Sequence, residues 1–554
     1  MDLAVALVDN LLPGLVTQPL SMVELVAALI FVMLLRRRAA GLAAAGRIWT
    51  AAARRAGRVS LAVAGLLLLL HAAAENWTVR RAPGVHDEFA YLLSAATFLE
   101  GRATNPTPAE SRSLETVHVN LKPTYNAMYP PGQGLALAAA WRLTGNPLYA
   151  NWAGAAALAW IAWWSLRGWL PARWALAGAC IVGLRFGVFG YWAESYMNGW
   201  LPAACGFGYA GALGRWLRRP RVGLAIVAGA SLATLFSCRP FETVVLAAAT
   251  LPVLLKLRWA WPAIAGLAVL AAGVAGVAFH NQRLTGSPFR FGYDVNYRHY
   301  GFGVLPGSSL QPEELPPTQH LAAFYDDQRA YFRWGWSPLG FIATRIKALG
   351  LLWAFFLGPF LSLGLCAIRA VWRSPKRRVW LWTLAGSLVG LALNPWFFPH
   401  YFAASFVWLL LVVLNGFRVL ALRQRAAPML MTAAAVLTVL IRAAAGEAVV
   451  PPPRNPHARL AFNTPRGNEA RVAMERQLRA DGQAAAVFVR YAKDHSPYDD
   501  WVYNAPDPAR APVLWLNDLG PETNARVLRA YPARRAYCVE LSGARQNLTA
   551  GDCP

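Results

Sequence analysis

Residues 19–38 read PLSMVELVAALIFVMLLRRR, an apolar run that stops at three consecutive arginines. An α-helix rises 1.5 Å per residue, so a run of this length can cross the ~30 Å hydrocarbon core of a bilayer. Basic residues are enriched on the cytoplasmic side of membrane helices. The stretch therefore predicts a first membrane helix with its N-terminus outside and its arginines inside.

The composition of the whole chain supports a membrane protein. Of its 554 residues, 56% are hydrophobic and 15% are charged, and the mean hydropathy is +0.33. The net charge of +25 would suit a nucleic-acid binder if the basic side chains were clustered on a water-soluble module. They lie between apolar runs instead. The composition excludes a soluble chain, and we expect no nucleic-acid partner.

Twelve hydrophobic runs of about spanning length follow one another along the chain. They lie at about 19–35, 59–75, 148–166, 174–190, 198–213, 222–238, 241–255, 262–280, 347–368, 380–395, 401–416 and 428–445. With the first run oriented as above, the inner connections hold 23 bases and no acid. One missed span would exchange the sides of all later loops, so this partition predicts a multi-pass α-helical membrane protein with about 12 spans.

The topology leaves three long outward segments. We expect a transmembrane domain over residues 1–445, with outer loops at 76–147 and 281–346, then a linker at 446–466 and a small extracytoplasmic α/β domain at 467–554. In the first loop, the apolar stretch from Gly132 to Leu143 is too short to span and is predicted to be a juxtamembrane helix at the outer leaflet.

The tail has the periodicity of alternating helices and strands. Helices are predicted at 468–481 and 522–530, and strands at 485–491, 513–516 and 536–541. Cys538 and Cys553 lie in this exported part of the chain, where they would pair in an oxidising compartment.

The first outer loop contains HDEFAYLL at residues 86–93, and its apolar residues recur at helical spacing up to Gly101. Asp87 stands at the head of this predicted helix. It is either an N-cap that accepts a backbone N–H, or a carboxylate at the water–lipid boundary that deprotonates an acceptor. Glu88 points about 100° away on a helix, so we expect this second candidate acid to have a separate role.

Two motifs of this loop carry a family resemblance. HDEFAYLLSAATFLEGRATNP at 86–106 and HVNLKPTYNAMYPPGQG at 118–134 resemble polyprenyl-phosphate-dependent glycosyltransferases with the C-type membrane fold. The family includes the bacterial relatives of protein mannosyltransferases and of lipid A aminoarabinose transferase (family 39-like), which the two motifs resemble. The resemblance covers roughly residues 59–420, and it implies a C-type glycosyltransferase fold.

The resemblance also implies an activity, namely the inverting transfer of a sugar from a polyprenyl-phosphate donor to an acceptor outside the cytoplasm. Asp87 matches the catalytic acid of the family. The expected partners are the lipid-linked sugar donor, membrane lipid, and a lipid, glycan or protein acceptor. The expected location is the inner membrane of a bacterium, with the active site and the tail facing the periplasm. Some C-type enzymes use a divalent metal ion and others do not, so the resemblance leaves this cofactor open.

Family members carry a second acid in the next outer turn, which Glu194 matches; the alternative is an interfacial anchor. They often place a lysine just before the Pro-Pro helix, where this chain has Met128 and Tyr129. Lys122 upstream is the substitute for that phosphate ligand or an ordinary exposed lysine, and Tyr129 is a further candidate for donor contact.

Three more residue pairs are candidates for binding the donor. Arg239 can hold a phosphate with Glu242 orienting it, or the two can simply pair with each other where Pro240 breaks the helix. Arg298 and His299 lie in a stretch rich in bases and aromatics, which suits a sugar phosphate or a folded loop. His400 and Tyr401 open another span at the outer boundary, where substrate contact and interfacial anchoring are both reasonable.

Two other functions remain open from the sequence. A transporter or lipid flippase would favour ionisable groups near the membrane midplane and broken helices in repeated halves, whereas the acids here gather at one face. A glycan ligase or polymerase of another membrane fold would use outer-face arginine and histidine without the Asp87 motif.

Overall fold

The computed structural model describes residues 19–37, 39–75, 82–188, 190–255, 261–421, 424–445, 468–543 and 545–551. Its contacts divide the chain into two compact units. We call the first, Met1–Val79, Ala150–Val274 and Pro338–Thr464, the helical unit. The second, Arg80–Tyr149, Ala275–Ser337 and Pro465–Pro554, is the loop unit. The predicted linker at 446–466 lies outside the described residues, as does Cys553.

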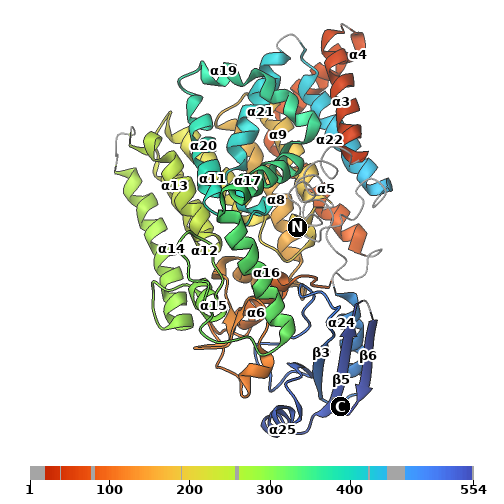
Figure 1. Ribbon diagram of the computed structural model, residues 1–554. Helices are drawn as coiled ribbons and strands as arrows, with labels where there is room; N and C mark the ends of the chain where they lie inside the picture. Colours follow the sequence, from red (N-terminus) through yellow and green to blue (C-terminus); the bar gives the residue numbers. More distant parts are fainter. Residues whose placement is uncertain are drawn as a thin grey trace. The chain divides into compact units, whose positions relative to one another are not determined.

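The helical unit contains the apolar helices, of which α14 continues past Val274 into the loop unit (Figure 1). They are α3 (Pro19–Arg36), α4 (Ala40–Arg54), α5 (Ala56–Glu75), α8 (Tyr149–Arg167), α9 (Ala172–Gly187), α10 (Tyr191–Glu194), α11 (Trp200–Trp216), α12 (Val222–Cys238), α13 (Pro240–Leu254), α14 (Pro262–Thr285), α17 (Pro338–Leu352), η2 (Trp353–Leu357), α18 (Gly358–Ser362), η3 (Leu363–Ala367), α19 (Ile368–Trp372), α20 (Arg378–Ala392), η4 (Pro399–Phe402), α21 (Phe406–Leu420) and α22 (Ala427–Ala445). Each of the twelve hydrophobic runs overlaps a helix.

Three helical segments are, by length and composition, long and apolar enough to cross a membrane. They are Ala56–Ala73, Pro262–Thr285 and Pro338–Trp372, and five shorter apolar helices accompany them in the described part of the chain. On α5, Leu61 and Leu69 are 56% and 68% exposed, an apolar surface that suits lipid rather than water. The chain is thus a helical membrane protein, and the number of twelve spans stays a prediction.

The run predicted as one span at 347–368 is an interrupted helix. The segment Pro338–Trp372 passes through a π-turn at Trp353–Leu357, and Gly358 has a φ of +62°. A π-turn widens the ladder and leaves carbonyl groups without their regular helical partners. Arg185 of α9 is the hydrogen-bond partner of two of these carbonyl groups. Its Nε donates to the Phe355 oxygen at 2.8 Å, and its Nη2 donates to the Ala354 oxygen at 3.0 Å.

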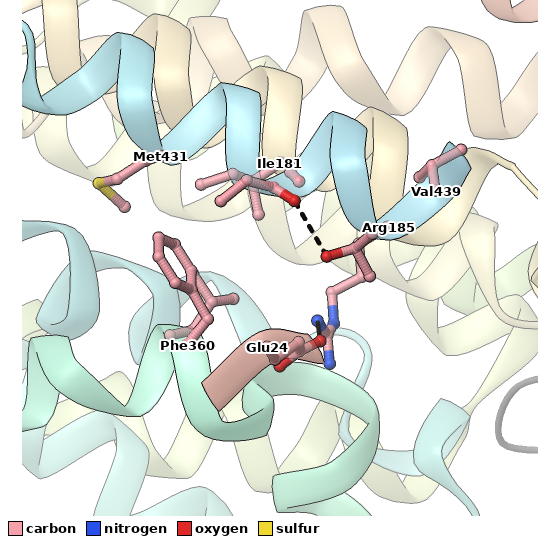
Figure 2. A pocket seen from close by; sticks show the side chains of 10 residues that line it. Glu24, Ile181, Arg185, Phe360, Met431 and Val439 are labelled. Carbon is pink, nitrogen blue, oxygen red and sulfur yellow. Dashed lines mark hydrogen bonds and ion pairs between the residues drawn. The ribbon is translucent and has the colours of Figure 1, made fainter. Parts of the chain in front are cut away.

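The same arginine forms a buried ion pair. Its Nη1 lies 2.9 Å from Oε1 of Glu24 in α3, and the two side chains are 14% and 6% exposed. Figure 2 shows this pair at one end of a cavity of about 40 Å³ with Phe360 and Met431 on its apolar side. Among the described residues, Oε2 of Glu24 has no hydrogen-bond partner, and the cavity has room for the water that would satisfy it.

The loop unit combines parts of all three predicted outward segments. Its elements are α6 (His86–Leu99), η1 (Ser111–Leu114), β1 (Val119–Asn120), β2 (Asn126–Ala127), α7 (Pro131–Thr144), α15 (Gly292–Tyr300), α16 (Gln319–Trp336), α24 (Glu469–Ala480), β3 (Ala485–Tyr491), β4 (Val513–Asn517), α25 (Pro521–Ala530), β5 (Arg535–Ser542) and β6 (Arg545–Ala550). The predicted helices at 86–99 and 132–143 and all five predicted elements of the tail are present.

The tail folds around a mixed four-stranded sheet in the order β4-β3-β5-β6 (Figure 1). β3 pairs in parallel with β4 and β5, and β6 is antiparallel to β5. We did not predict β6, because RQNLTA is a polar edge strand without alternation. Val487, Trp501 and Trp515 belong to the buried core of the sheet, and Cys538 on β5 is disulfide-bonded.

The tail makes contacts with the first outer loop inside the loop unit, and the domain at 467–554 stays a prediction. Asn517 donates to the Ser113 and Glu115 carbonyls at 3.4 and 2.8 Å, and Tyr125 donates to the Asn504 carbonyl at 3.0 Å. These bonds bury polar groups of both partners, so the tail and the first outer loop are held together as one folded body.

Candidate active site

The helix α6 begins with a cap that the sequence did not assign correctly. Its N-cap is Val85, and Oε2 of Glu88 accepts hydrogen bonds from the Gly84 and Val85 N–H groups at 2.8 and 3.3 Å. A carboxylate three residues into a helix commonly satisfies these free donors. The interpretation of Asp87 as an N-cap is therefore wrong; Glu88 has the capping role, and the Asp87 carboxylate makes other contacts.

Asp87 belongs to a cluster of four polar side chains. The Tyr129 hydroxyl donates a short hydrogen bond to Oδ1 of Asp87 and lies 2.8 Å from Nδ1 of His118. Since the hydroxyl proton goes to the carboxylate, His118 Nδ1–H must be the donor to the Tyr129 oxygen. Nε2 of His86 lies 3.3 Å from Oδ2 of Asp87, and the two imidazoles meet edge to face with centroids 4.5 Å apart.

The chain brings this cluster together through a short hairpin. β1 and β2 pair Val119 with Ala127, and Met128 N–H donates to the His118 carbonyl at 3.1 Å. His118 has a φ of +62°, a left-handed conformation that costs energy for a side chain and is concentrated at functional sites. Tyr129 lies two residues after the end of β2, and Pro131 then starts α7 at a position that tolerates proline.

Close packing of α7 on α6 fixes the distance between Tyr129 and Asp87. A Cβ on Gly134 would lie 2.6 Å from Cβ of Ser94 and 3.0 Å from the Phe98 ring. Only glycine allows this approach without displacing the neighbouring helix. The last glycine of the Pro-Pro-Gly-Gln-Gly motif, Gly134, is therefore required for the packing of α7 on α6.

Burial sets the charge state of the cluster. Desolvation lowers the pKa of His118 to about 3, with a further lowering from His86 and an opposing effect of Asp87. It also lowers the pKa of His86, against the attraction of Asp87. Burial and the neighbouring Asp87 raise the pKa of Tyr129 well above its usual value. Both imidazoles are therefore neutral at pH 7, and Tyr129 keeps its proton.

This protonation pattern predicts a pH-dependent stability. Below pH 6.5 an unfolded histidine takes up a proton that folded His118 does not take up until about pH 3, so the free energy of unfolding falls with pH in that window. At pH 5 the difference is about 1.5 pH units, or about 2 kcal/mol. We expect a lower melting temperature at pH 5 than at pH 7 in the purified protein.

The variant His118→Asn is the matched test, because asparagine tolerates a positive φ and does not titrate. It should reduce the difference in stability between pH 7 and pH 5 by about 2 kcal/mol. An unchanged difference would assign the acid sensitivity to other groups.

The cluster also has the donor set of a metal site. One ligand atom each of His86, Asp87 and His118 lies within 4.8 Å of the others. Two neutral imidazoles and one carboxylate are suitable ligands for a divalent transition metal, for which ligand atoms stand roughly 3.3 Å apart around a tetrahedral ion. These residues fit the divalent ion that the family resemblance left open.

A second group of predicted residues gathers in the helical unit. The Arg239 guanidinium lies over the Tyr401 ring at 5.0 Å from its centroid and 4.0 Å from Oε1 of Glu242. His400, 2% exposed, stacks on Phe398. Glu194 ends α10 and is half-buried.

The remaining predicted residues lie elsewhere in the loop unit. Lys122 is exposed in the β1–β2 hairpin, and Arg298 is exposed on α15. Nε2 of His299 lies 3.9 Å from Oε2 of Glu115. Among the described residues, no contact joins His299 to Asp87. The sequence pattern did not predict a role for His118 or for His86. His118 opens the HVNLKPTYNAMYPPGQG motif that carries the family resemblance, and its place in that motif could have indicated a role in the site.

Comparisons with known proteins give structural likeness only. The chain is similar to ArnT from Cupriavidus metallidurans bound to undecaprenyl phosphate, with a TM-score of 0.47 and 12% identity over 89% of this chain and 92% of that one. It is also similar to the Archaeoglobus fulgidus oligosaccharyltransferase in the apo form (TM-score 0.44, 13% identity, 88% and 69% covered). The complex of Archaeoglobus fulgidus AglB with an inhibitory peptide and a dolichol-phosphate gives a TM-score of 0.44 at 14% identity, with 88% and 69% covered. No family model and no curated protein matches the sequence.

Proposed function

We propose that the protein transfers a sugar from a polyprenyl-phosphate donor to an acceptor at the outer face of the membrane, with Asp87 as the general base. The proposal rests above all on the Asp87 cluster. Tyr129 binds one oxygen of the Asp87 carboxylate and His86 lies beside the other, so the group is held in one orientation. The side chain is 24% exposed, so a substrate can still contact it. The family resemblance of the first outer loop supplies the reaction class.

The reaction needs little covalent help from the protein. The acceptor oxygen forms a bond to the anomeric carbon as the bond from that carbon to the phosphate oxygen breaks, and in-line attack inverts the configuration. The acceptor proton moves to Asp87, and the polyprenyl phosphate leaves with the electron pair. The Tyr129 hydroxyl, which is itself hydrogen-bonded to His118, holds the carboxylate oriented for this transfer.

The departing phosphate needs positive charge. We propose that Arg239, which contacts Glu242 and Tyr401, is the phosphate ligand of the helical unit. Glu194, as a second acid, and His400 stay candidates in the same unit. Lys122, Arg298 and His299 are retained as weaker candidates for the donor. Where a divalent ion binds, His86, Asp87 and His118 would hold it, and it would supply positive charge beside the reacting oxygen.

The proposal can be tested on the purified protein in lipid nanodiscs. A radiolabelled polyprenyl-phosphate sugar is incubated with membrane glycolipid, glycan and protein acceptors, and the release of polyprenyl phosphate is followed together with labelled product. Undecaprenyl phosphate, the lipid bound in the ArnT structure, is the natural carrier to use. Movement of the donor between leaflets without bond cleavage would favour the flippase, and transfer from a donor without polyprenyl phosphate would favour another ligase.

The proposed sidedness is a separate prediction. Arg510, 89% exposed in the tail, and Arg219, exposed between α11 and α12, should lie on opposite sides of the membrane. In a Cys366→Ala background, we expect Arg510→Cys to react with an impermeant maleimide in spheroplasts and Arg219→Cys to react only after permeabilisation. Labelling of both positions before permeabilisation would overturn the topology.

A further inference from the structure

A polar cleft of about 650 Å³ lies within the loop unit. Its walls come from the Glu110–Arg112 turn of the first outer loop, the start of α16, and the tail where β3, β4 and α25 meet. Binding sites for small molecules typically measure about 300–1,000 Å³. In sheets with parallel strands, ligands bind at the carboxyl ends of the strands, which is where β3 and β4 reach the cleft.

The charges of the cleft occur as fixed pairs of opposite sign. Nε and Nη2 of Arg490 both lie 2.8 Å from Oδ2 of Asp518. The other carboxylate oxygen of Asp518 accepts from Asn524 at 2.7 Å, so the pair is held rigidly. Arg526 lies 3.5 Å from Glu110.

The third arginine of the wall, Arg112, is also paired. It bonds Glu314 and donates to the Leu315 carbonyl at 2.9 Å. Each arginine of the cleft thus has a carboxylate partner, and the charges nearly cancel. A phosphate would meet these carboxylates, whereas a hydroxyl can donate to a carboxylate and accept from the guanidinium beside it.

A stacked ring pair completes the wall. The His320 imidazole lies on the Tyr491 ring with centroids 3.7 Å apart and planes 10° apart. His320 is 9% exposed, and its Nε2 has no hydrogen-bond partner among the described residues. A buried ring nitrogen without a partner is costly, and a ligand hydroxyl would satisfy it.

Two routes connect this wall to the Asp87 cluster. Phe324, one turn after His320 on α16, meets the His86 and His118 rings edge to face at 5.2 and 6.1 Å. Asp500 accepts hydrogen bonds from Tyr491 at 2.6 Å and from Thr116 at 2.7 Å, two residues before His118. The cleft and the proposed base are therefore parts of one packed structure.

We propose that this cleft binds an uncharged, hydroxyl-rich saccharide, and that the acceptor of the transfer is a glycan or carries one. The assignment of this saccharide as acceptor rests on the proposed function, whereas binding itself does not. The paired charges orient the hydroxyl groups, and α16 joins the wall of the cleft to the packing around the Asp87 cluster.

The test measures glycan binding by the full-length protein in nanodiscs. A printed array of neutral and phosphorylated oligosaccharides identifies ligands, and titration of the best neutral one gives its Kd. We expect Arg526→Gln to weaken binding about tenfold, the effect of losing a hydrogen bond from a charged group. Arg510→Gln is the matched control, because Arg510 lies outside the cleft and is 89% exposed.

A second variant in the cleft distinguishes a specific loss of binding from misfolding of the first variant. His320→Phe keeps the stack on Tyr491 and removes Nε2, and it should weaken binding by a similar factor. Asp87→Asn should bind the same glycan like the parent, so loss of transfer and loss of binding are separate results. Retention of no array glycan, a preference for phosphorylated glycans, or equal effects of Arg526→Gln and Arg510→Gln would overturn the proposal.

Discussion

Replacing Asp87 by Asn is expected to lower the rate of sugar transfer by about 10³-fold, within the range for loss of a positioned general base. The amide oxygen can still accept the Tyr129 hydrogen bond, so the cluster keeps its shape while the proton acceptor is lost. The measurement is the initial rate of product formation in nanodiscs at saturating donor, with the melting temperature as a check on folding.

Glu88→Gln is the informative comparison, since it changes the neighbouring acid on the same helix turn. Glu88 is 4% exposed and accepts two backbone N–H groups. We expect this variant to lose about 1 kcal/mol of stability, as other weakened caps do, and to keep its transfer rate within a few-fold. If Asp87→Asn transfers sugar at the parent rate, Asp87 is not the base. Equal losses of rate in both variants would favour disruption of α6.

Replacing Glu24 by Ala is expected to destabilise the helical unit by about 3–5 kcal/mol, because it leaves the Arg185 guanidinium buried without its carboxylate. Arg185 also donates to Ala354 and Phe355 oxygens in the π-turn, so its displacement would loosen the interrupted helix. We expect a marked fall in the melting temperature in micelles and lower yield from the membrane.

A double variant separates the pair from the packing around it. Glu24→Leu with Arg185→Met removes both charges, and buried pairs replaced by apolar residues are often as stable as the parent. The double variant should therefore be more stable than Glu24→Ala, reduced chiefly by the two bonds lost at the π-turn. If the double variant is less stable than Glu24→Ala, the loss of stability in Glu24→Ala does not come from an unpaired buried charge on Arg185.

Local pattern was sufficient for the helices in the twelve apolar runs and for one half of the site, but it did not predict α4, α15 or α16. The apolar runs predicted helices because each residue contributes to burial or exposure independently of distant partners. The spacing after His86 predicted α6, and Asp87 was singled out from its place at the head of that helix. The same reasoning left Asp87 open as an N-cap or as a reacting carboxylate, because spacing alone does not say which carboxylate turns back to the free N–H groups. In the structure Glu88 does so.

The sequence by itself determined a basic, helix-rich membrane chain with acids and aromatics gathered in its long loops, since hydropathy and charge act locally. Only the tertiary structure decided which of those groups meet. His118 reaches Asp87 through a two-stranded hairpin and a left-handed turn, and Arg185 reaches Glu24 across 161 positions of sequence. Such contacts depend on chain closure and on desolvation by residues remote in the sequence, and these set the charge states of the cluster as well as its geometry.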